Sequence, residues 1–356
     1  MNSINFHKDL KLNGYSFLSN EDLLRYVKTI SKDIALFLEE WFNNNDYIIV
    51  KTSGSTGVPK PIPLYKKFVV NSAKATSTYF ELPSKTTALL CLPIEYIAGK
   101  MMLIRALTLG WHLDIGLISS FPLERIDKTY HFSAMVPLQV ENSLHNLHKI
   151  RKLIVGGGSI SNQLHEKLKN VTTTQIYETY GMTETITHIA VKPIQNSVYT
   201  ISKNSSSYFQ VLPGVTIYKD LRNCLVIKAP KITKEVVFTN DVVNLISDNQ
   251  FEWLGRFDNV INSGGIKINP EYIERKIAKM ISYRFFIASI FDKKLGEKVI
   301  LVIECEEESF KISNFNLFKE LTKFQTPKNT YFLKEFITTE SGKIQRNKTL
   351  KKINLD

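Results

Sequence analysis

Lys51-Thr-Ser-Gly-Ser-Thr-Gly-Val-Pro-Lys60 is a stretch rich in glycine and hydroxyl side chains, and it follows the apolar run Tyr47-Ile-Ile-Val50. The apolar run predicts a short buried strand bounded by turn signals. Glycine lets the backbone turn tightly, and hydroxyl and backbone N–H groups can donate to phosphate oxygens. The stretch differs from a Walker A sequence, because only two residues separate Gly54 from Gly57. It therefore predicts either a phosphate-binding loop or a polar surface loop.

The length and composition are those of a globular protein with a sizeable core. The chain has 356 residues, of which 43% are apolar and 22% charged, and this length predicts about two domains. The formal net charge of +12 is compatible with nucleic acid, an acidic membrane surface or an anionic substrate. Because the lysines are spread along the chain without zinc-finger spacing or an aromatic ribonucleoprotein motif, we expect no nucleic-acid partner.

The three cysteines predict a reducing environment. Cys91, Cys224 and Cys305 are far apart and lie in apolar or strand-like surroundings, which is typical of reduced core residues. The N-terminus lacks the apolar core of a signal peptide, and no stretch approaches the roughly 18 apolar residues of a membrane span. We therefore expect a soluble, cytoplasmic protein.

Apolar spacing predicts an α/β architecture with a largely parallel sheet in the first half of the chain, because strands alternate with helices there. The expected helices are 20–41, with Ser19 or Asn20 as the N-cap, 66–79, a segment ending near 109, 137–147 and 161–168. The expected strands are 87–92, 114–117, 131–136, 152–155 and 174–177.

After about Val191 the pattern changes to short strands separated by turns, which predicts antiparallel sheet. These strands are expected at 208–211, 225–228, 235–239, 242–246 and 251–254. From Asn259 onward we expect a compact mixed unit. It has a helix from Pro270, strands around Phe286 and Val299, a helix near Leu317 and a basic tail.

Tyr177-Glu-Thr-Tyr-Gly-Met-Thr-Glu184 is the second stretch with chemical potential. A tyrosine ring offers a face on which a flat base can stack, Thr183 offers a hydroxyl for phosphate, and Glu184 offers an oxygen ligand for Mg²⁺. A turn followed by a helix cap would use the same residues.

Together, Thr-Ser-Gly-Ser-Thr-Gly-x-Pro-Lys and Tyr-Gly-x-Thr-Glu resemble the two signatures of the adenylate-forming enzymes, which include acyl-CoA synthetases and adenylation domains. The two motifs occur in the family's order, about 130 residues apart. The resemblance implies that the first loop binds ATP phosphates, that Tyr180 stacks on adenine, that Thr183 contacts phosphate and that Glu184 holds magnesium. The phosphate-loop residues so implied are Thr52, Ser53, Gly54, Ser55, Thr56, Gly57 and Lys60.

Two further segments match the family pattern. Gly156-Gly-Gly-Ser159 implies that Gly157, Gly158 and Ser159 form pocket backbone beside adenine and the acyl group. Thr239-Asn-Asp241 stands where the family has Thr-Gly-Asp, and Asp241 is implied to bind the ribose hydroxyls. Asn240 replaces that glycine and is one of the few residues that tolerate a left-handed backbone.

Gly255 to Glu274 is the longest match. The resemblance implies that Arg256 contacts ribose or phosphate, that Asp258 is the hinge between two domains, and that Gly264 and Gly265 line the tunnel for coenzyme A. Near the C-terminus, Gly342-Lys-Ile-Gln-Arg346 implies that Lys343 is the lysine of the adenylation step.

The resemblance implies a large N-terminal domain of mixed, layered α/β sheets over 1–257 and a small mobile α+β domain over 258–356. It implies an acid–thiol ligase that uses ATP, Mg²⁺ and coenzyme A and works through an acyl-AMP intermediate. The catalytic residues would be Lys343, Thr183 and Glu184. Relatives carry well over a hundred residues before the phosphate loop, whereas 50 precede it here, so the large domain is expected to be N-terminally shortened.

A compact subgroup, the o-succinylbenzoate–CoA ligases of menaquinone biosynthesis, is the one that the chain resembles most. The segment Leu92 to Leu107 is similar to the acyl-pocket segment of these ligases, with Tyr96 where they usually have histidine. The implied substrate pocket contains Tyr96, Gly99, Lys100 and Arg105. A cation in this pocket suits a small acid with a second carboxylate, because a fatty chain would leave the cation unpaired. Both cations could instead be solvated on a helix face.

Three alternatives stay open at this point. Another acyl- or aryl-CoA synthetase would share every motif except the pocket. A stand-alone adenylation enzyme would load a carrier protein instead of free coenzyme A. A non-catalytic relative would only bind nucleotide or a partner.

Overall fold

The computed structural model describes residues 6–51, 61–194, 208–310, 317–338 and 344–353. The chain forms two compact units. The first unit comprises residues 1–217, 227–237 and 247–250, and the second comprises 218–226, 238–246 and 251–356. The predicted boundary between 257 and 258 stays a prediction.

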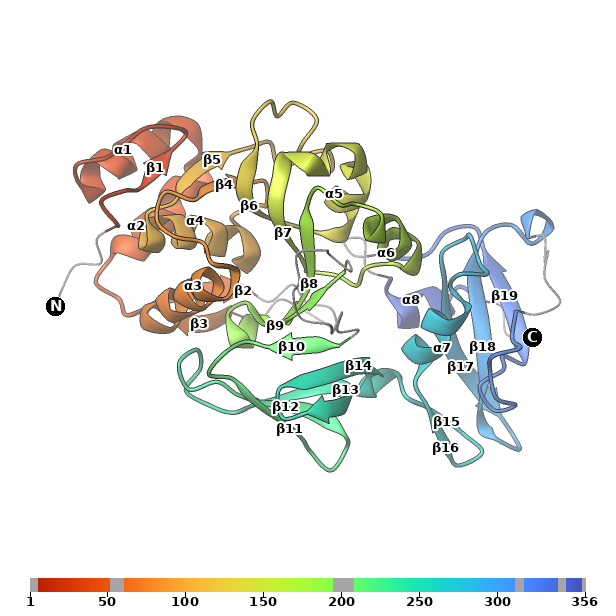
Figure 1. Cartoon of the computed structure of the whole chain (residues 1–356). Helices are drawn as coiled ribbons and strands as arrows, with labels where there is room; N and C mark the ends of the chain where they lie inside the picture. Colours follow the sequence, from red (N-terminus) through yellow and green to blue (C-terminus); the bar gives the residue numbers. More distant parts are fainter. Residues whose placement is uncertain (1–5, 52–60, 195–207, 311–316, 339–343, 354–356) are drawn as a thin grey trace. The chain divides into compact units, whose positions relative to one another are not determined.

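A mainly parallel sheet organises the first unit (Figure 1). Its hydrogen-bonded order is β1-β5-β4-β6-β7-β8-β9-β10, and all neighbours from β1 to β8 are parallel, whereas β9 and β10 are antiparallel. The strands are β1 Lys11–Leu12, β4 Thr87–Leu90, β5 His112–Ile115, β6 Tyr130–Met135, β7 Ile150–Val155, β8 Gln175–Gly181, β9 His188–Pro193 and β10 Phe209–Val211. The prediction of an α/β fold with a largely parallel sheet is confirmed.

The strand order reverses direction beside β4. The chain passes from β4 outward to β5 and then returns to the other side of β4 as β6. In open α/β sheets, ligands bind outside the carboxyl ends of the strands at such a switch point. The segments that follow β4, β6, β7 and β8 all leave from this edge, because these strands are parallel.

Helices cover the sheet of the first unit (Figure 1). Helix α4 contacts β4, β5 and β6, and α3 packs on α4. The helices of this unit are α1 Asn20–Ile30, α2 Lys32–Phe42, α3 Lys66–Phe80, α4 Ile97–Leu109, α5 Pro137–Asn142 and α6 Asn162–Lys169, with the short 3-10 helices η1 Leu144–Lys149 and η2 Thr183–Thr185.

The predicted single helix over 20–41 is wrong at Ser31. Ser31 has extended backbone angles, its N–H closes α1 on the Val27 carbonyl, and its side chain caps α2 by accepting from the Ile34 N–H. A serine hydroxyl satisfies an N–H that a new helix leaves without a partner, so one residue ends one helix and begins another. The predicted N-cap Ser19 is confirmed, because its side chain accepts from the Asp22 N–H.

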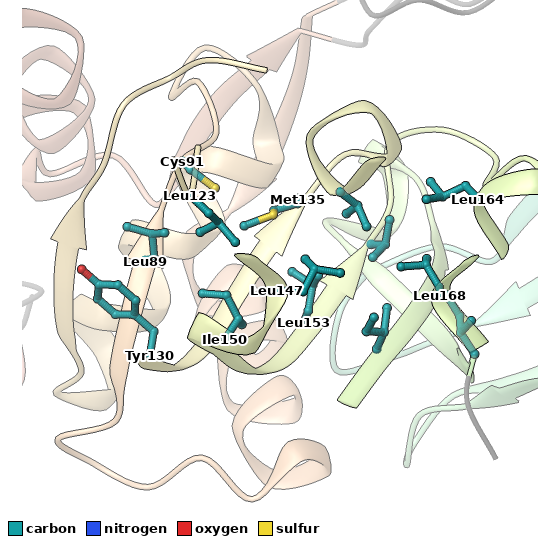
Figure 2. Close-up of a cluster of buried hydrophobic side chains, with 14 residues drawn as sticks. Leu89, Cys91, Leu123, Tyr130, Met135, Leu147, Ile150, Leu153, Leu164 and Leu168 are labelled. Carbon is teal, nitrogen blue, oxygen red and sulfur yellow. The ribbon is translucent and has the colours of Figure 1, made fainter. Parts of the chain in front are cut away.

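The hydrophobic core beneath the carboxyl edge of the sheet lies between β4, β6 and β7 and the helices η1 and α6. Figure 2 shows side chains from β4, β6 and β7, including Leu89, Met135 and Leu153, packed with Leu147 of η1 and Leu168 of α6. All five are at most 1% exposed. At roughly 1.5–3 kcal/mol for each large apolar side chain that is buried, this cluster holds the strand ends firmly.

A separate two-stranded hairpin flanks the predicted phosphate loop. Strands β2 Tyr47–Lys51 and β3 Pro61–Tyr65 are antiparallel, and Lys51 pairs with Pro61. The predicted strand at 47–50 is confirmed, but only Ile48 and Val50 are buried, whereas Ile49 is 41% exposed. Buried and exposed side chains alternate in a hairpin that has one covered face, whereas a fully buried strand has buried side chains on both faces.

Four strands follow one another in the order β14-β13-β12-β11, and their residues are divided between the two units. They are β11 Thr216–Lys219, β12 Cys224–Lys228, β13 Val237–Ser247 and β14 Gln250–Arg256. The two strands predicted at 235–239 and 242–246 are one continuous strand, β13. Asn240 therefore does not break the strand, although its residue type favoured a turn there.

The second unit contains a second sheet in the order β16-β15-β18-β17, with β19 parallel to β18. Its elements are the 3-10 helix η3 Phe257–Asn259, β15 Ile261–Ser263, β16 Ile266–Ile268, α7 Pro270–Ile277, β17 Phe285–Asp292, β18 Gly296–Glu304, η4 Glu307–Ser309, β19 Asn329–Leu333 and α8 Arg346–Leu350. Residues 317–320 form turns, so the helix predicted near Leu317 is wrong for this part of the chain. No helix within the described residues is long and apolar enough to cross a membrane.

Candidate active site

The structure places three of the predicted site segments at the carboxyl edge of the parallel sheet. The segment with Tyr96 and α4 follows β4, the glycine segment follows β7, and Tyr180 lies at the end of β8. These segments are far apart in the sequence, but parallel strands bring them to one edge. The topology therefore gathers them within the first unit.

The glycine segment after β7 makes a tight connection to β8. The Thr179 hydroxyl donates to the Val155 carbonyl at 3.0 Å, and a Cβ on Gly156 would lie 2.4 Å from that hydroxyl oxygen. Gly157 has φ +76°, which favours glycine, and a Cβ on Gly158 would meet nothing closer than 3.9 Å. Gly157 and Ser159 are exposed. Gly156 is thus needed for strand packing, whereas the residues predicted as pocket backbone face solvent or open space.

Tyr180 is supported from the side of β9 and β10. The Phe209 ring centroid lies 5.8 Å from that of Tyr180, and the Lys192 ammonium lies 4.8 Å above the Phe209 ring. Lys192 also pairs with Glu178 at 2.6 Å. A β-bulge falls between Tyr180 and Gly181, and a bulge at a strand end changes the direction of the side chains that follow. Tyr180 itself is partly exposed, as base stacking requires.

Thr183 and Glu184 lie on η2, which a strained turn follows. Ile186 has φ 67° and ψ −62°, and the Thr187 N–H donates to the Thr185 carbonyl at 2.7 Å. These are the angles of a γ-turn, which is unfavourable for a β-branched residue and is found mainly at functional sites. Glu184 is exposed, and no hydrogen bond or ion pair joins it to another described residue. The strained turn ends η2 and leaves the Glu184 carboxylate open to solvent.

Arg105 is a buried cation on α4. Arg105 is 2% exposed, and among the described residues its Nε has no hydrogen-bond partner, while its Nη1 donates to the Met102 sulfur at 3.6 Å. Burial lowers the pKa of the guanidinium from 12.5 to about 9. The predicted alternative, a solvated cation on a helix face, is therefore wrong for Arg105.

His188, on β9, shares the electrostatic environment of Arg105. It is 6% exposed, and its Nε2 has no hydrogen-bond partner among the described residues. Burial, and secondly the positive charge of Arg105, lowers its pKa to about 3. The imidazole is therefore neutral at physiological pH.

The other predicted pocket residues lie in a different environment from Arg105. The Lys100 ammonium lies 4.4 Å from the Phe37 ring of α2, and burial lowers its pKa. Tyr96 is 42% exposed at the start of α4. Gly99 is a packing residue, because a Cβ there would lie 2.1 Å from the Pro93 carbonyl oxygen. The structure thus does not bring Lys100 and Arg105 together on one face of α4.

The predicted nucleotide residues of the second unit form a cluster of their own. Arg256 donates to Asp258 at 2.7 Å and lies 3.8 Å from Asp241. Asp241 is 7% exposed and accepts from the Trp253 indole N–H at 3.0 Å. Asn240 donates to both carboxylate oxygens of Asp258, at 3.1 and 3.3 Å. The structure therefore brings Asp241, Arg256 and Asp258 together.

Gly264 and Gly265 form the two-residue turn between β15 and β16. Their φ angles are +60° and +82°, and Ser263 pairs with Ile266 across the turn. Such hairpin turns favour glycine at both central positions. The remaining predicted site residues, Thr52 to Lys60 and Lys343, lie outside the described residues.

The sequence did not point to three residues of these clusters, Phe209, His188 and Ile186, nor to the hydrogen-bonding role of Asn240. An aromatic residue in a short strand and a histidine in an apolar strand gave no distinctive pattern. Asn240 did carry a signal, because it replaces a glycine of the family motif. Its partners, however, lie in other parts of the chain.

The family described as AMP-binding enzyme matches residues 18–219.

The chain belongs to the AMP-binding enzyme family.

Named relatives support the same family. The 2-succinylbenzoate–CoA ligase of Lactococcus lactis subsp. lactis is 26% identical over 321 residues, which is 84% of this chain and 69% of the relative. The Escherichia coli enzyme of the same name is 25% identical and covers 78% of this chain and 62% of its own. The predictions of an adenylate-forming enzyme and of an AMP-forming acid–thiol ligase are confirmed.

Solved structures agree on the fold. A crystal structure of an acyl-CoA synthetase (AMP-forming)/AMP-acid ligase II-like protein from Dyadobacter fermentans is 34% identical, covers 90% of this chain and 93% of its own, and superposes with a TM-score of 0.59. The o-succinylbenzoate CoA synthetase of Bacillus subtilis, in complex with its acyl-adenylate intermediate, is 21% identical, covers 86% of this chain and 69% of its own, and has a TM-score of 0.70. The first of these matches over nearly its whole length.

Proposed function

We propose that this protein is an ATP-dependent ligase that joins o-succinylbenzoate to coenzyme A through an acyl-AMP intermediate, a step of menaquinone biosynthesis. The relatives that carry this name and the family assignment support the reaction class. The choice of a substrate with two carboxylates rests on one observation, the buried charge of Arg105.

A buried guanidinium without a counter-ion is unfavourable. Among the described residues no carboxylate pairs with Arg105, and no acidic group contributes to its pKa, which burial alone lowers. A charge removed from water costs several kcal/mol unless an opposite charge compensates it. A substrate that brings a second carboxylate supplies this compensation, whereas a fatty acid or benzoate does not.

His188 fits the same substrate. A neutral imidazole beside a guanidinium adds no positive charge of its own, and its ring nitrogen can hydrogen-bond to an incoming carboxylate oxygen. In the proposed acyl pocket, Arg105 would present one fixed charge and His188 one neutral polar group, and acids that leave both unpaired would be disfavoured.

The reaction has two steps. The reactive carboxylate attacks the α-phosphate of ATP, which releases pyrophosphate and gives acyl-AMP. The thiol of coenzyme A then attacks the acyl carbon, loses its proton and releases AMP. The loop from Thr52 to Lys60 would hold the β- and γ-phosphates, and Lys343 would bridge the carboxylate and the α-phosphate. Fixed donors and cations stabilise the negative charge that builds up in the transition state.

Glu184 suits the magnesium ion of this reaction. Mg²⁺ in phosphoryl-transfer sites is held by one or two carboxylates together with substrate phosphates and waters. Glu184 is a single exposed carboxylate at the sheet edge, and the described residues contain no cluster of three or more metal-binding side chains. The residues present therefore fit an ion that arrives with ATP, which would neutralise phosphate charge there.

The remaining roles are proposed for the second unit and for the pocket rim. Asp241 would accept the two ribose hydroxyls, and Arg256 would contact ribose or phosphate. Residues 258–356 would rotate about Asp258 between the two steps, and Gly264 and Gly265 would line the path of coenzyme A. Tyr96, exposed at the start of α4, would close the acyl channel.

The test is pyrophosphate release and thioester formation across a panel of acids. We expect turnover with o-succinylbenzoate that exceeds turnover with benzoate and medium-chain acids. Good turnover with a monocarboxylate and none with o-succinylbenzoate would replace the substrate assignment. Pyrophosphate release without a coenzyme A thioester would favour an enzyme that loads a carrier protein. No pyrophosphate release with any acid would favour a nucleotide-binding relative without catalysis.

A further inference from the structure

A continuous chain of polar contacts connects the β11–β12 turn to Asp241 within the second unit. Arg222 lies at the start of this chain and pairs with Asp220, with its Nε and Nη2 both 2.8 Å from Oδ2. Its Nη1 donates to the Asn240 amide oxygen and its Nη2 also donates to the Thr239 carbonyl, each at 3.0 Å. Its guanidinium carbon lies 5.2 Å from the Phe257 ring. Arg222 is therefore held in one orientation from three directions.

Asn240 connects Arg222 to Asp258 by hydrogen bonds. Its amide oxygen accepts from Arg222, and its amide nitrogen donates to both oxygens of Asp258. Arginine can only donate and an ionised carboxylate can only accept, so the amide has a single orientation that satisfies both partners. A glycine at position 240, as in the family motif, has no side chain to make this connection.

Arg256 lies between two carboxylates. It is 2.7 Å from Asp258 but 3.8 Å from Asp241. Hydrogen bonds between ionised groups are strong at the shorter distance and weaken quickly beyond it. If the Asp258 carboxylate turned away, Asp241 would be the nearest acid. Arg256 would then occupy carboxylate oxygens that the ribose hydroxyls require.

We propose that Arg222 and Asn240 are positioning residues of the nucleotide site. They fix Asp258, and Asp258 keeps Arg256 from closing on Asp241. This inference rests on the proposed role of Asp241 in ribose binding. It adds a device that belongs to this chain, because it depends on the asparagine that replaces the family glycine.

The experiment measures AMP binding by titration calorimetry, without any acyl substrate. Asn240→Gly removes the connection and Arg222→Met removes its support. We expect each variant to bind AMP about tenfold more weakly, the change expected from the loss of one hydrogen bond to a charged group. Leu221→Ala is the matched control, because Leu221 lies fully exposed in the same turn beside Arg222. It should bind AMP like the wild type.

Coupling to Arg256 separates positioning from a general loss of structure. In an Arg256→Met background, Asn240→Gly should cause no further loss of AMP affinity, because the competing guanidinium is absent. Trp253 supplies an independent readout, since its indole donates to Asp241 while Trp41 and Trp111 are fully buried. AMP should change Trp253 fluorescence in the wild type. A fluorescence titration of Asn240→Gly should show the same loss of AMP affinity as the calorimetry.

Two results would overturn the inference alone: unchanged AMP affinity in Asn240→Gly, or an equal loss with and without Arg256. If the wild-type protein bound no AMP, the proposed function would fail as well.

Discussion

Replacement of Arg105 by methionine should make the protein more stable and remove its preference for a second carboxylate. Arg105 is 2% exposed, and no residue in the described part of the chain hydrogen-bonds to its Nε. Methionine is also unbranched and has a similar helix propensity, so α4 should be retained. The substitution removes a buried charge without adding a new polar group. The variant should therefore be more stable than the wild type but should no longer prefer an acid with a second carboxylate.

The size of the stability change follows from the pKa of Arg105. Burial lowers it from 12.5 to about 9, which corresponds to roughly 4–5 kcal/mol at about 1.36 kcal/mol per pH unit. Imperfect packing around methionine offsets part of this, so we expect a gain of about 1–4 kcal/mol in the free energy of unfolding. The gain should not depend on pH in the physiological range, because the guanidinium stays charged there.

The activity assay compares o-succinylbenzoate with an analogue that lacks its second carboxylate. Truncating one partner of a buried charge pair costs about 2–5 kcal/mol, so kcat/KM for o-succinylbenzoate should fall roughly 30- to 5000-fold. The kcat/KM for the analogue should change little. Arg151→Met is the control for removing a positive charge, because Arg151 is exposed on β7. It should change neither unfolding nor the preference between the two acids.

The proposed pairing would be contradicted by a variant that unfolds at lower denaturant concentration and keeps wild-type kcat/KM for o-succinylbenzoate. It would mean that Arg105 is structural and that the substrate carboxylate binds elsewhere.

Three further predictions concern neighbouring positions. Gly156→Ala should lower the free energy of unfolding by about 1–3 kcal/mol, because its Cβ would lie 2.4 Å from the Thr179 hydroxyl oxygen. Gly158→Ala, with nothing closer than 3.9 Å, should unfold like the wild type in the same urea titration. His188→Gln should resist acid better: the folded pKa is about 3 against 6.5, so acidification from pH 6.5 to 4.5 destabilises the wild type by about 2.3 kcal/mol that the variant does not lose. Lys343→Ala should slow pyrophosphate release by roughly a hundredfold or more while sparing thioester formation from supplied acyl-AMP, and equal loss in both steps would contradict its role.

The site could be predicted from the sequence where a motif directly follows a strand. The glycines after β7 and Tyr180 at the end of β8 lie at one edge of the sheet, because parallel strands bring their carboxyl ends together. Their roles in binding stay predictions. Gly264 and Gly265 form a two-residue hairpin turn, which requires positive φ, and their role in lining the coenzyme A path stays a prediction. In these cases local chemistry and topology lead to the same position.

Other features depend on contacts that a linear pattern does not contain. Helical spacing continues across Ser31, yet its hydroxyl caps a new helix there. Lys100 and Arg105 share a helix and a charge, but the ring of Phe37 draws Lys100 to another neighbour. Asn240 favours a turn by residue type, but it stays in strand β13 and hydrogen-bonds to Arg222 and Asp258. Tertiary partners decided each of these positions.

If Arg105 pairs with the second carboxylate of the substrate, an acid that lacks this carboxylate should be a poor substrate. The most direct measurement is the ratio of kcat/KM for o-succinylbenzoate to that for the analogue without its second carboxylate, followed as coenzyme A thioester by mass spectrometry. We predict a ratio of at least roughly 30 for the wild-type enzyme, the lower end of the cost of leaving a buried charge unpaired. A ratio near one, or faster turnover of the analogue, would contradict this pairing.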